Sequence, residues 1–188
     1  MLRIVRIVGM TLVSMLVISG VASAHNFTSS VTGNLKAVAN QNQVFTTGGG
    51  TTVICKKVTI VKGTASSGVQ LSTLAEIEYT ECTAEGFGLK AAASISLAQY
   101  VFSADNELVR LENSIVINVP SLACHTTVKP QDLKAVLYKN TNKHVVVEPH
   151  VAGILSEGSG SVCGGHSATG TYTGSTEVEV VGGEISWS

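Results

Sequence analysis

The sequence predicts an all-β fold: a β-sandwich, or a Greek-key or jelly-roll-like barrel, with about ten short antiparallel strands. The clearest observation is the alternation over 69–79. One side of this segment carries Val69, Leu71, Thr73, Ala75, Ile77 and Tyr79, and the other side is more polar. A period of two residues is typical of a strand with one buried face. A second observation is that segments rich in Val, Ile and Thr recur along the chain, separated by clusters of Gly, Asn and Ser. Many short strands separated by turns favour a sandwich or a barrel.

The predicted strands cover most of the chain after residue 50. They are expected at 52–62, 69–79, 89–102, 107–112, 114–119, 122–129, 134–139, 144–151, 170–174, 176–181 and 184–187. The polar run at 140–143 between two of them predicts a hairpin loop. Helical signals are sparse, and only 130–133, with Pro130 in first position, suggests a single helical turn.

The first 24 residues have the pattern of a secretory signal peptide. Arg3 and Arg6 precede an uncharged apolar run at 7–21, and Ala22-Ser23-Ala24 places small residues where a signal peptidase cleaves. A helix over this apolar run would span roughly 22 Å, less than the ~30 Å hydrocarbon core of a bilayer. We therefore expect cleavage after Ala24, no membrane span in the mature chain, and a secreted, extracellular or cell-envelope location.

Composition indicates one ordinary globular domain. The chain has 188 residues with 12 Lys and Arg against 13 Asp and Glu. Removal of the signal peptide leaves a mildly acidic protein without the basic excess that nucleic-acid binding requires. We expect an N-terminal arm or edge strand at 25–45, because that stretch is polar, and a single β domain at 46–188.

The four cysteines, Cys55, Cys82, Cys124 and Cys163, predict disulfides, because an even number in an exported chain usually forms bridges. Three connectivities are possible, and we favour the sequential one, Cys55–Cys82 with Cys124–Cys163. Each bridge would stabilise the fold by about 3–4 kcal/mol in the chain-entropy model. The alternative is a metal site that includes His166, which follows Cys163 in a C-x-x-H spacing, but a single such pair is a weak zinc signal.

Three segments together resemble a group of small secreted bacterial β-proteins of uncharacterised activity. They are the strand around Cys55 that leads to Gly63-Thr64, the Tyr79-x-x-Cys82-Thr83 ending, and Cys163 followed by 170–175. The resemblance implies a secreted β domain and transfers no activity. Members of that group carry extra cysteines near the positions of Gln99 and Asn113, which this chain lacks.

His25 is the first candidate metal ligand. Cleavage after Ala24 would give it a free α-amine, and an amine and an imidazole can together chelate copper. With a second histidine, the arrangement looks like the copper site of lytic polysaccharide monooxygenases. The motifs and abundant aromatic residues of that family are missing, and a frayed terminal histidine is the alternative.

The second candidate is His144-x-x-x-Glu148-x-His150. Even spacing puts the three side chains on one face of a strand, and imidazole and carboxylate are suitable ligands for zinc or iron. Residues six apart lie about 20 Å apart on a strand, so only Glu148 and His150 could share a metal. The alternative, which we favour, is a solvated edge strand marked by Pro149, with valines facing inward.

No motif for nucleophilic catalysis or phosphate binding occurs, so the sequence predicts neither an enzyme nor a cofactor. We expect a secreted or cell-surface, structural or adhesive domain. One alternative is an extracellular module that binds carbohydrate or another ligand, such as an envelope component or glycan. A concave sheet carrying Tyr100, Tyr138, Tyr172 or Trp187 would be its signature. The second alternative is a copper-dependent oxidative enzyme built on His25.

Overall fold

The computed structural model describes residues 25–86, 88–105, 107–160 and 168–188. The predicted signal peptide, Cys163 and His166 lie outside these ranges. The all-β prediction is confirmed, since the described residues form sixteen strands and a single 3₁₀ turn, η1 (Pro120–Leu122). The described ranges contain no helix with the length and apolar character that crossing a membrane requires.

Five of the strands are long and form the middle of the large sheet, in the order β5-β3-β2-β15-β14. All neighbouring strands are antiparallel. Their bounds are β2 (Gly33–Thr46), β3 (Thr52–Ala65), β5 (Ser72–Gly86), β14 (His144–Ser159) and β15 (Ala168–Val180).

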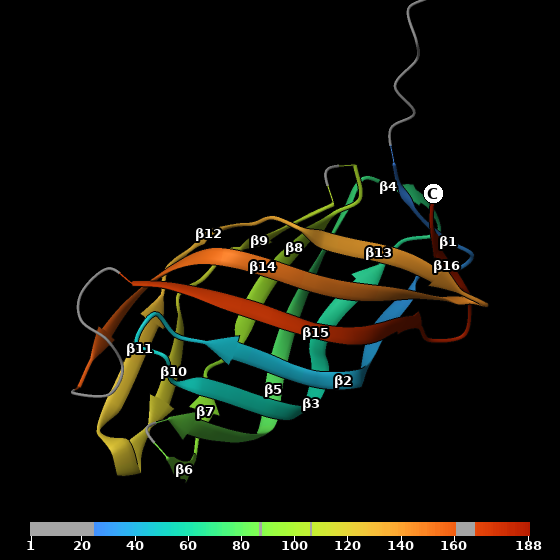
Figure 1. Cartoon of the computed structure of the whole chain (residues 1–188). Helices are drawn as coiled ribbons and strands as arrows, with labels where there is room; N and C mark the ends of the chain where they lie inside the picture. Colours follow the sequence, from blue (N-terminus) through green and yellow to red (C-terminus); the bar gives the residue numbers. More distant parts are fainter. Residues whose placement is uncertain (1–24, 87, 106, 161–167) are drawn as a thin grey trace, which may run out of the picture.

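Both outer strands of this middle sheet change partner along their length. The first half of β5 pairs with β8 and its second half with β6. In the same way, β14 pairs first with β13 and then with β11. The shorter strands extend the sheet, which curls into a half-barrel (Figure 1). They are β6 (Leu89–Ala92), β7 (Ser94–Ile95), β8 (Ala98–Ser103), β9 (Leu108–Leu111), β10 (Ile115–Val119), β11 (Cys124–Val128), β12 (Gln131–Leu133) and β13 (Val136–Thr141).

A small second sheet, in the order β16-β1-β4, lies near one end of the half-barrel (Figure 1). It consists of β1 (Phe27–Ser29), β4 (Gly68–Gln70) and β16 (Ile185–Trp187). Phe27 and Ile185 are buried and belong to the same core as the large sheet. The small sheet therefore covers this end of the apolar interior.

The N-terminal segment departs from the expected arm or edge strand at 25–45. Within it, β2 lies in the interior of the large sheet between β3 and β15. The prediction was wrong because it took the polar residues of the segment as a sign of an arm. In the structure Lys36 and Asn40 are exposed on one face of β2, and Leu35 is buried on the other. The segment is a central strand with one solvated face.

Two further expectations need correction. The alternation over 69–79 holds from Thr73 onward, but Val69 and Leu71 are exposed. Val69 belongs to β4 in the small sheet, and Leu71 lies between β4 and β5. The helical turn expected at 130–133 is the strand β12 instead. Backbone pairing with β9 places β12 in the sheet. The Gln131 side chain also bonds it to β14, since it donates to the carbonyl of Leu155 and accepts from the Leu155 amide, both at 2.9 Å.

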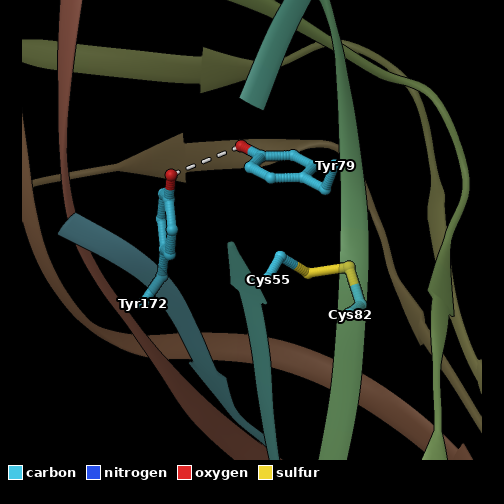
Figure 2. The surroundings of a disulfide bond; sticks show 4 residues. All are labelled: Cys55, Tyr79, Cys82 and Tyr172. Atoms are coloured by element: carbon cyan, nitrogen blue, oxygen red, sulfur yellow. Dashed lines mark hydrogen bonds between the residues drawn. A yellow bond between two sulfur atoms is a disulfide. The ribbon is translucent and has the colours of Figure 1, made fainter. Parts of the chain in front are cut away.

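Other local predictions are confirmed. β13 and β14 form a hairpin in which Thr141 pairs with His144, and Asn142 adopts a left-handed φ of 48° in its tight turn. Cys55 and Cys82 form a disulfide between directly paired positions of β3 and β5 (Figure 2). Cys124 is buried and is not a free thiol, whereas the predicted partner Cys163 lies outside the described residues.

The seam between β2 and β3, meaning the line along which the two strands lie side by side, has paired residues only at its two ends. Gly33 and Asn34 pair with Ala65 and Thr64, and the next paired residues are Gln43 with Cys55. By contrast, pairs between β3 and β5 recur along the whole length of their contact. Fewer ladder hydrogen bonds lower the free energy needed for local opening.

We expect backbone amides of residues 35–42 that face β3 to exchange with solvent faster than amides between β3 and β5. Hydrogen exchange followed by NMR at single-residue resolution measures the difference. Amides between β14 and β15, which pair extensively, serve as the internal reference. Equal protection of the amides between β2 and β3, between β3 and β5 and between β14 and β15 would contradict the proposed weak pairing of β2 with β3.

Candidate functional site

The described residues line an apolar cavity of about 60 Å³ between the curved sheet and its end cover. The inward faces of the long strands form its walls, with Ala37 from β2, Val58 from β3 and Val147 from β14. Residues Thr73, Ala75, Ile77 and Tyr79, which the alternation predicts to share one face, all line it. None of the described residues in its lining carries a charge. The cavity has room for about four to six water-sized groups.

Three tyrosines from separate strands form the polar part of this interior: Tyr79 of β5, Tyr100 of β8 and Tyr172 of β15. The Tyr79 hydroxyl donates to that of Tyr100 at 3.2 Å. It also lies 3.3 Å from the hydroxyl of Tyr172, a contact that Figure 2 shows. Phe45 stacks on the Tyr172 ring with centroids 4.4 Å apart and meets Tyr79 edge-on. The rings are thus fixed by packing, and their hydroxyls meet one another. We call these three residues the tyrosine cluster.

Gln43 joins the tyrosine cluster to the backbone. Its side chain is fully buried and accepts a hydrogen bond from the Tyr172 hydroxyl at 2.6 Å. The amide nitrogen donates to the carbonyls of Gln41 and Ser175 at 3.0 and 3.2 Å. A buried side-chain amide whose oxygen and nitrogen both form hydrogen bonds is held in one orientation.

Gly174 provides the space for Gln43. A Cβ at this position would lie 2.3 Å from Oε1 of Gln43 and 2.6 Å from its Cδ. The pairing of β15 with β2 shifts register on both sides of Ser175, which marks a bulge at this place. The segment 170–175 thus has a specific structural role, because it makes room for the buried amide that anchors Tyr172.

Burial keeps the tyrosine cluster uncharged. Desolvation raises the pKa of Tyr100 to about 12 and raises the pKa values of Tyr79 and Tyr172 above their usual range. Tyr138, whose hydroxyl donates to the carbonyl of Leu108, also has a pKa raised by desolvation. The cavity therefore presents neutral hydroxyl groups in an apolar surface even at about pH 10, where an exposed tyrosine is half ionised.

His25, the first candidate metal ligand, lies outside this cavity. Its ring stacks on Trp187 with centroids 4.7 Å apart, and its backbone nitrogen donates to Oδ1 of Asp105 at 3.2 Å. Nδ1 of the ring is buried, and none of the described residues gives it a hydrogen-bond partner. In the part of the chain that the structure describes, no group of three His, Cys, Asp or Glu residues could hold a metal ion.

The structure does not join the candidates on β14 to one another. The His144 ring contacts Glu177 and lies 3.6 Å from Glu179, both on β15. Glu148 forms an ion pair with Lys139, and the His150 side chain is exposed. The valines at 145, 147 and 151 face inward as expected, but this half of β14 pairs on both sides and is not an edge strand.

The aromatic residues expected on a concave sheet do gather, but inside the molecule. Tyr100 and Tyr138 are each only 3% exposed, and both line the cavity together with Tyr172. Trp187 is half-buried and packs near Tyr138. A flat sugar ring needs an accessible aromatic face, so this arrangement favours a ligand enclosed in the interior over a glycan bound at the surface.

Sequence reasoning missed Gln43 and the tyrosine cluster as a unit. Comparison of the chain with models of protein families, with curated proteins and with solved structures gave no match. The cavity and its tyrosine cluster are therefore the observations on which a function can be argued.

We expect none of the four tyrosines to ionise near pH 10 while the protein is folded. A raised native pKa favours the neutral form, so these groups contribute stability below pH ~10 that is lost as the pH rises through the native values. Absorbance at 295 nm should stay flat near pH 10 and rise together with loss of the circular dichroism signal. The chain unfolded in guanidinium is the control and should titrate near pH 10. A tyrosinate step near pH 10 in the folded protein would contradict the enclosed cluster.

Proposed function

We propose that this protein is a non-enzymatic binding protein that holds a small apolar molecule inside its half-barrel. The observation that carries the proposal is the uncharged cavity of about 60 Å³, which receives side chains from both sheets. Apolar cavities of this kind bind small hydrocarbons and xenon, because transfer from water to an apolar wall is favourable.

The architecture supports an enclosed ligand over an adhesive surface. Val69, Leu71 and Leu74 are close in sequence, but the other exposed large hydrophobic side chains lie on different segments, for example Val38 on β2, Leu137 on β13 and Leu155 on β14. Apolar residues scattered in this way are common on ordinary protein surfaces. The interior, in contrast, gathers aromatic residues from strands that are far apart in sequence.

The protein is proposed to act outside the cytoplasm after removal of residues 1–24. The Cys55–Cys82 bridge supports an oxidising compartment. The position of His25 agrees with processing at this point. Cleavage after Ala24 would turn its backbone nitrogen, which faces Asp105, into an ammonium group beside a carboxylate.

Xenon is the direct probe of the cavity. Under xenon pressure, methyl resonances of Val58, Ile77 and Val147 should shift in a saturable manner, because these side chains line the cavity. The substitution Ala37→Leu fills part of the space and should weaken xenon binding several-fold. The measurement is a series of carbon–proton NMR spectra at increasing xenon pressure.

Ala39→Leu is the matched control. Ala39 lies two residues further along β2 and packs against the core, but it is not in the lining of the cavity. This variant should bind xenon as the wild type does, with thermal melts confirming that both variants fold. Absence of saturable shifts in the wild type would refute the proposed function.

Export and processing have their own test. We expect the mature protein recovered from the medium or envelope to begin at His25 and to resist alkylation of its cysteines until it is reduced. Intact-mass spectrometry with and without reductant measures both properties. A chain that keeps residues 1–24, or that carries free thiols in its native state, would overturn the proposed location.

A further inference from the structure

Within the described part of the chain, not every hydroxyl proton of the tyrosine cluster has an acceptor. Tyr172 donates its proton to Gln43, and Tyr79 donates to Tyr100. Tyr100 acts as the acceptor in its contact with Tyr79. Among the described residues, no acceptor receives the proton of Tyr100 itself.

The Tyr100 hydroxyl is a donor that is buried away from bulk water. Tyr100 is 3% exposed, and its side chain lines the cavity. A buried donor without a partner is destabilising, because nothing offsets the loss of its hydrogen bond to water. In the absence of ligand a water molecule could accept the proton, since Thr73 and Thr176 also line the cavity, and a ligand oxygen would displace that water.

We propose that Tyr100 is the residue that orients the ligand, and that the ligand is a small neutral molecule with one hydrogen-bond acceptor on an aliphatic body, such as a ketone, ester or lactone. This inference rests on the proposed function. The acceptor oxygen takes the Tyr100 proton, while the aliphatic part contacts the apolar wall formed by residues such as Val58 and Val147.

The charge of the ligand follows from the lining. No charged side chain among the described lining residues could neutralise a carboxylate. Transfer of an ionised carboxylate into such surroundings costs far more than one hydrogen bond returns. The site therefore discriminates against fatty-acid anions and in favour of uncharged carbonyl compounds.

The test compares three small probes with equal numbers of non-hydrogen atoms: 2-butanone, n-pentane and propanoate. Dissociation constants come from NMR titration of the processed, disulfide-bonded protein. Tyr100→Phe removes the free donor and should lower the affinity for 2-butanone, relative to that for n-pentane, by about 3- to 10-fold. The variant should fold, because the Tyr79 hydroxyl keeps Tyr172 as a neighbour at 3.3 Å. Propanoate should show no saturable binding.

Tyr138→Phe is the matched control. Tyr138 lines the same cavity, but its hydroxyl already donates a hydrogen bond to the carbonyl of Leu108. This variant should leave the ratio of ketone to alkane affinity unchanged. If n-pentane and 2-butanone bind but the ratio is the same in Tyr100→Phe and wild type, this inference is wrong and the proposed function stands. An equal loss in both variants, or binding of propanoate, also overturns it. If neither n-pentane nor 2-butanone binds, the proposed function itself fails and the inference with it.

Discussion

The need to bury four phenol groups inside one curved sheet shapes the centre of this molecule. Alternation along β5 turns Tyr79 inward, and the same period on β8 and β15 brings Tyr100 and Tyr172 to the same interior. Because the interior excludes water, each hydroxyl must bond to a protein group or remain unpaired. The hydrogen bonds among the tyrosines therefore restrict how these three strands can be placed relative to one another.

That restriction extends to residues that look unremarkable in the sequence. Gln43 can accept from Tyr172 only because the bulge near Ser175 offers its carbonyl and Gly174 leaves space. A larger residue at 174 would displace the amide, and Tyr172 would lose its acceptor. The polar cluster and the irregular pairing of β15 with β2 thus depend on each other. Polar networks of this kind select one arrangement of strands, because a shifted register would leave several groups unpaired.

The sequence predicts the features of this fold that depend on neighbouring residues, and it fails for those that depend on pairing with a distant strand. Local periodicity predicts the inward residues of 73–79, and the polar run at 140–143 predicts a hairpin. It fails where the partner strand decides the outcome: Val69 and Leu71 fit the pattern but are exposed, since 68–70 pair with β1 in the small sheet. The polar residues at 25–45 suggest an arm, yet β2 is central, because a strand can carry one solvated face anywhere in a curled sheet.

The candidate site was hidden for the same reason. Tyr79 and Tyr172 are 93 positions apart, and Gln43 and Tyr172 are 129 apart, so no spacing rule joins them. The histidines, in contrast, drew attention by local spacing and proved unrelated: His144 contacts carboxylates on β15, and the His150 side chain is exposed. Residue type indicates which groups can carry chemistry, but the order and register of the strands decide which of them meet.

An interior site requires a route to it, and the pairing pattern offers one. Leu35 and Ala37 of β2 and Val58 and Ile60 of β3 line the cavity, and they lie along the stretch of seam that has no paired residues. Separation of β2 from β3 there breaks fewer backbone hydrogen bonds than opening any fully paired seam. Because the ladder resumes on both sides in the same register, the strands return to the same alignment when they close. The end covered by the small sheet is a less favourable route, since opening it would expose Phe27 and Ile185 and break the pairs that β1 forms with β16 and β4.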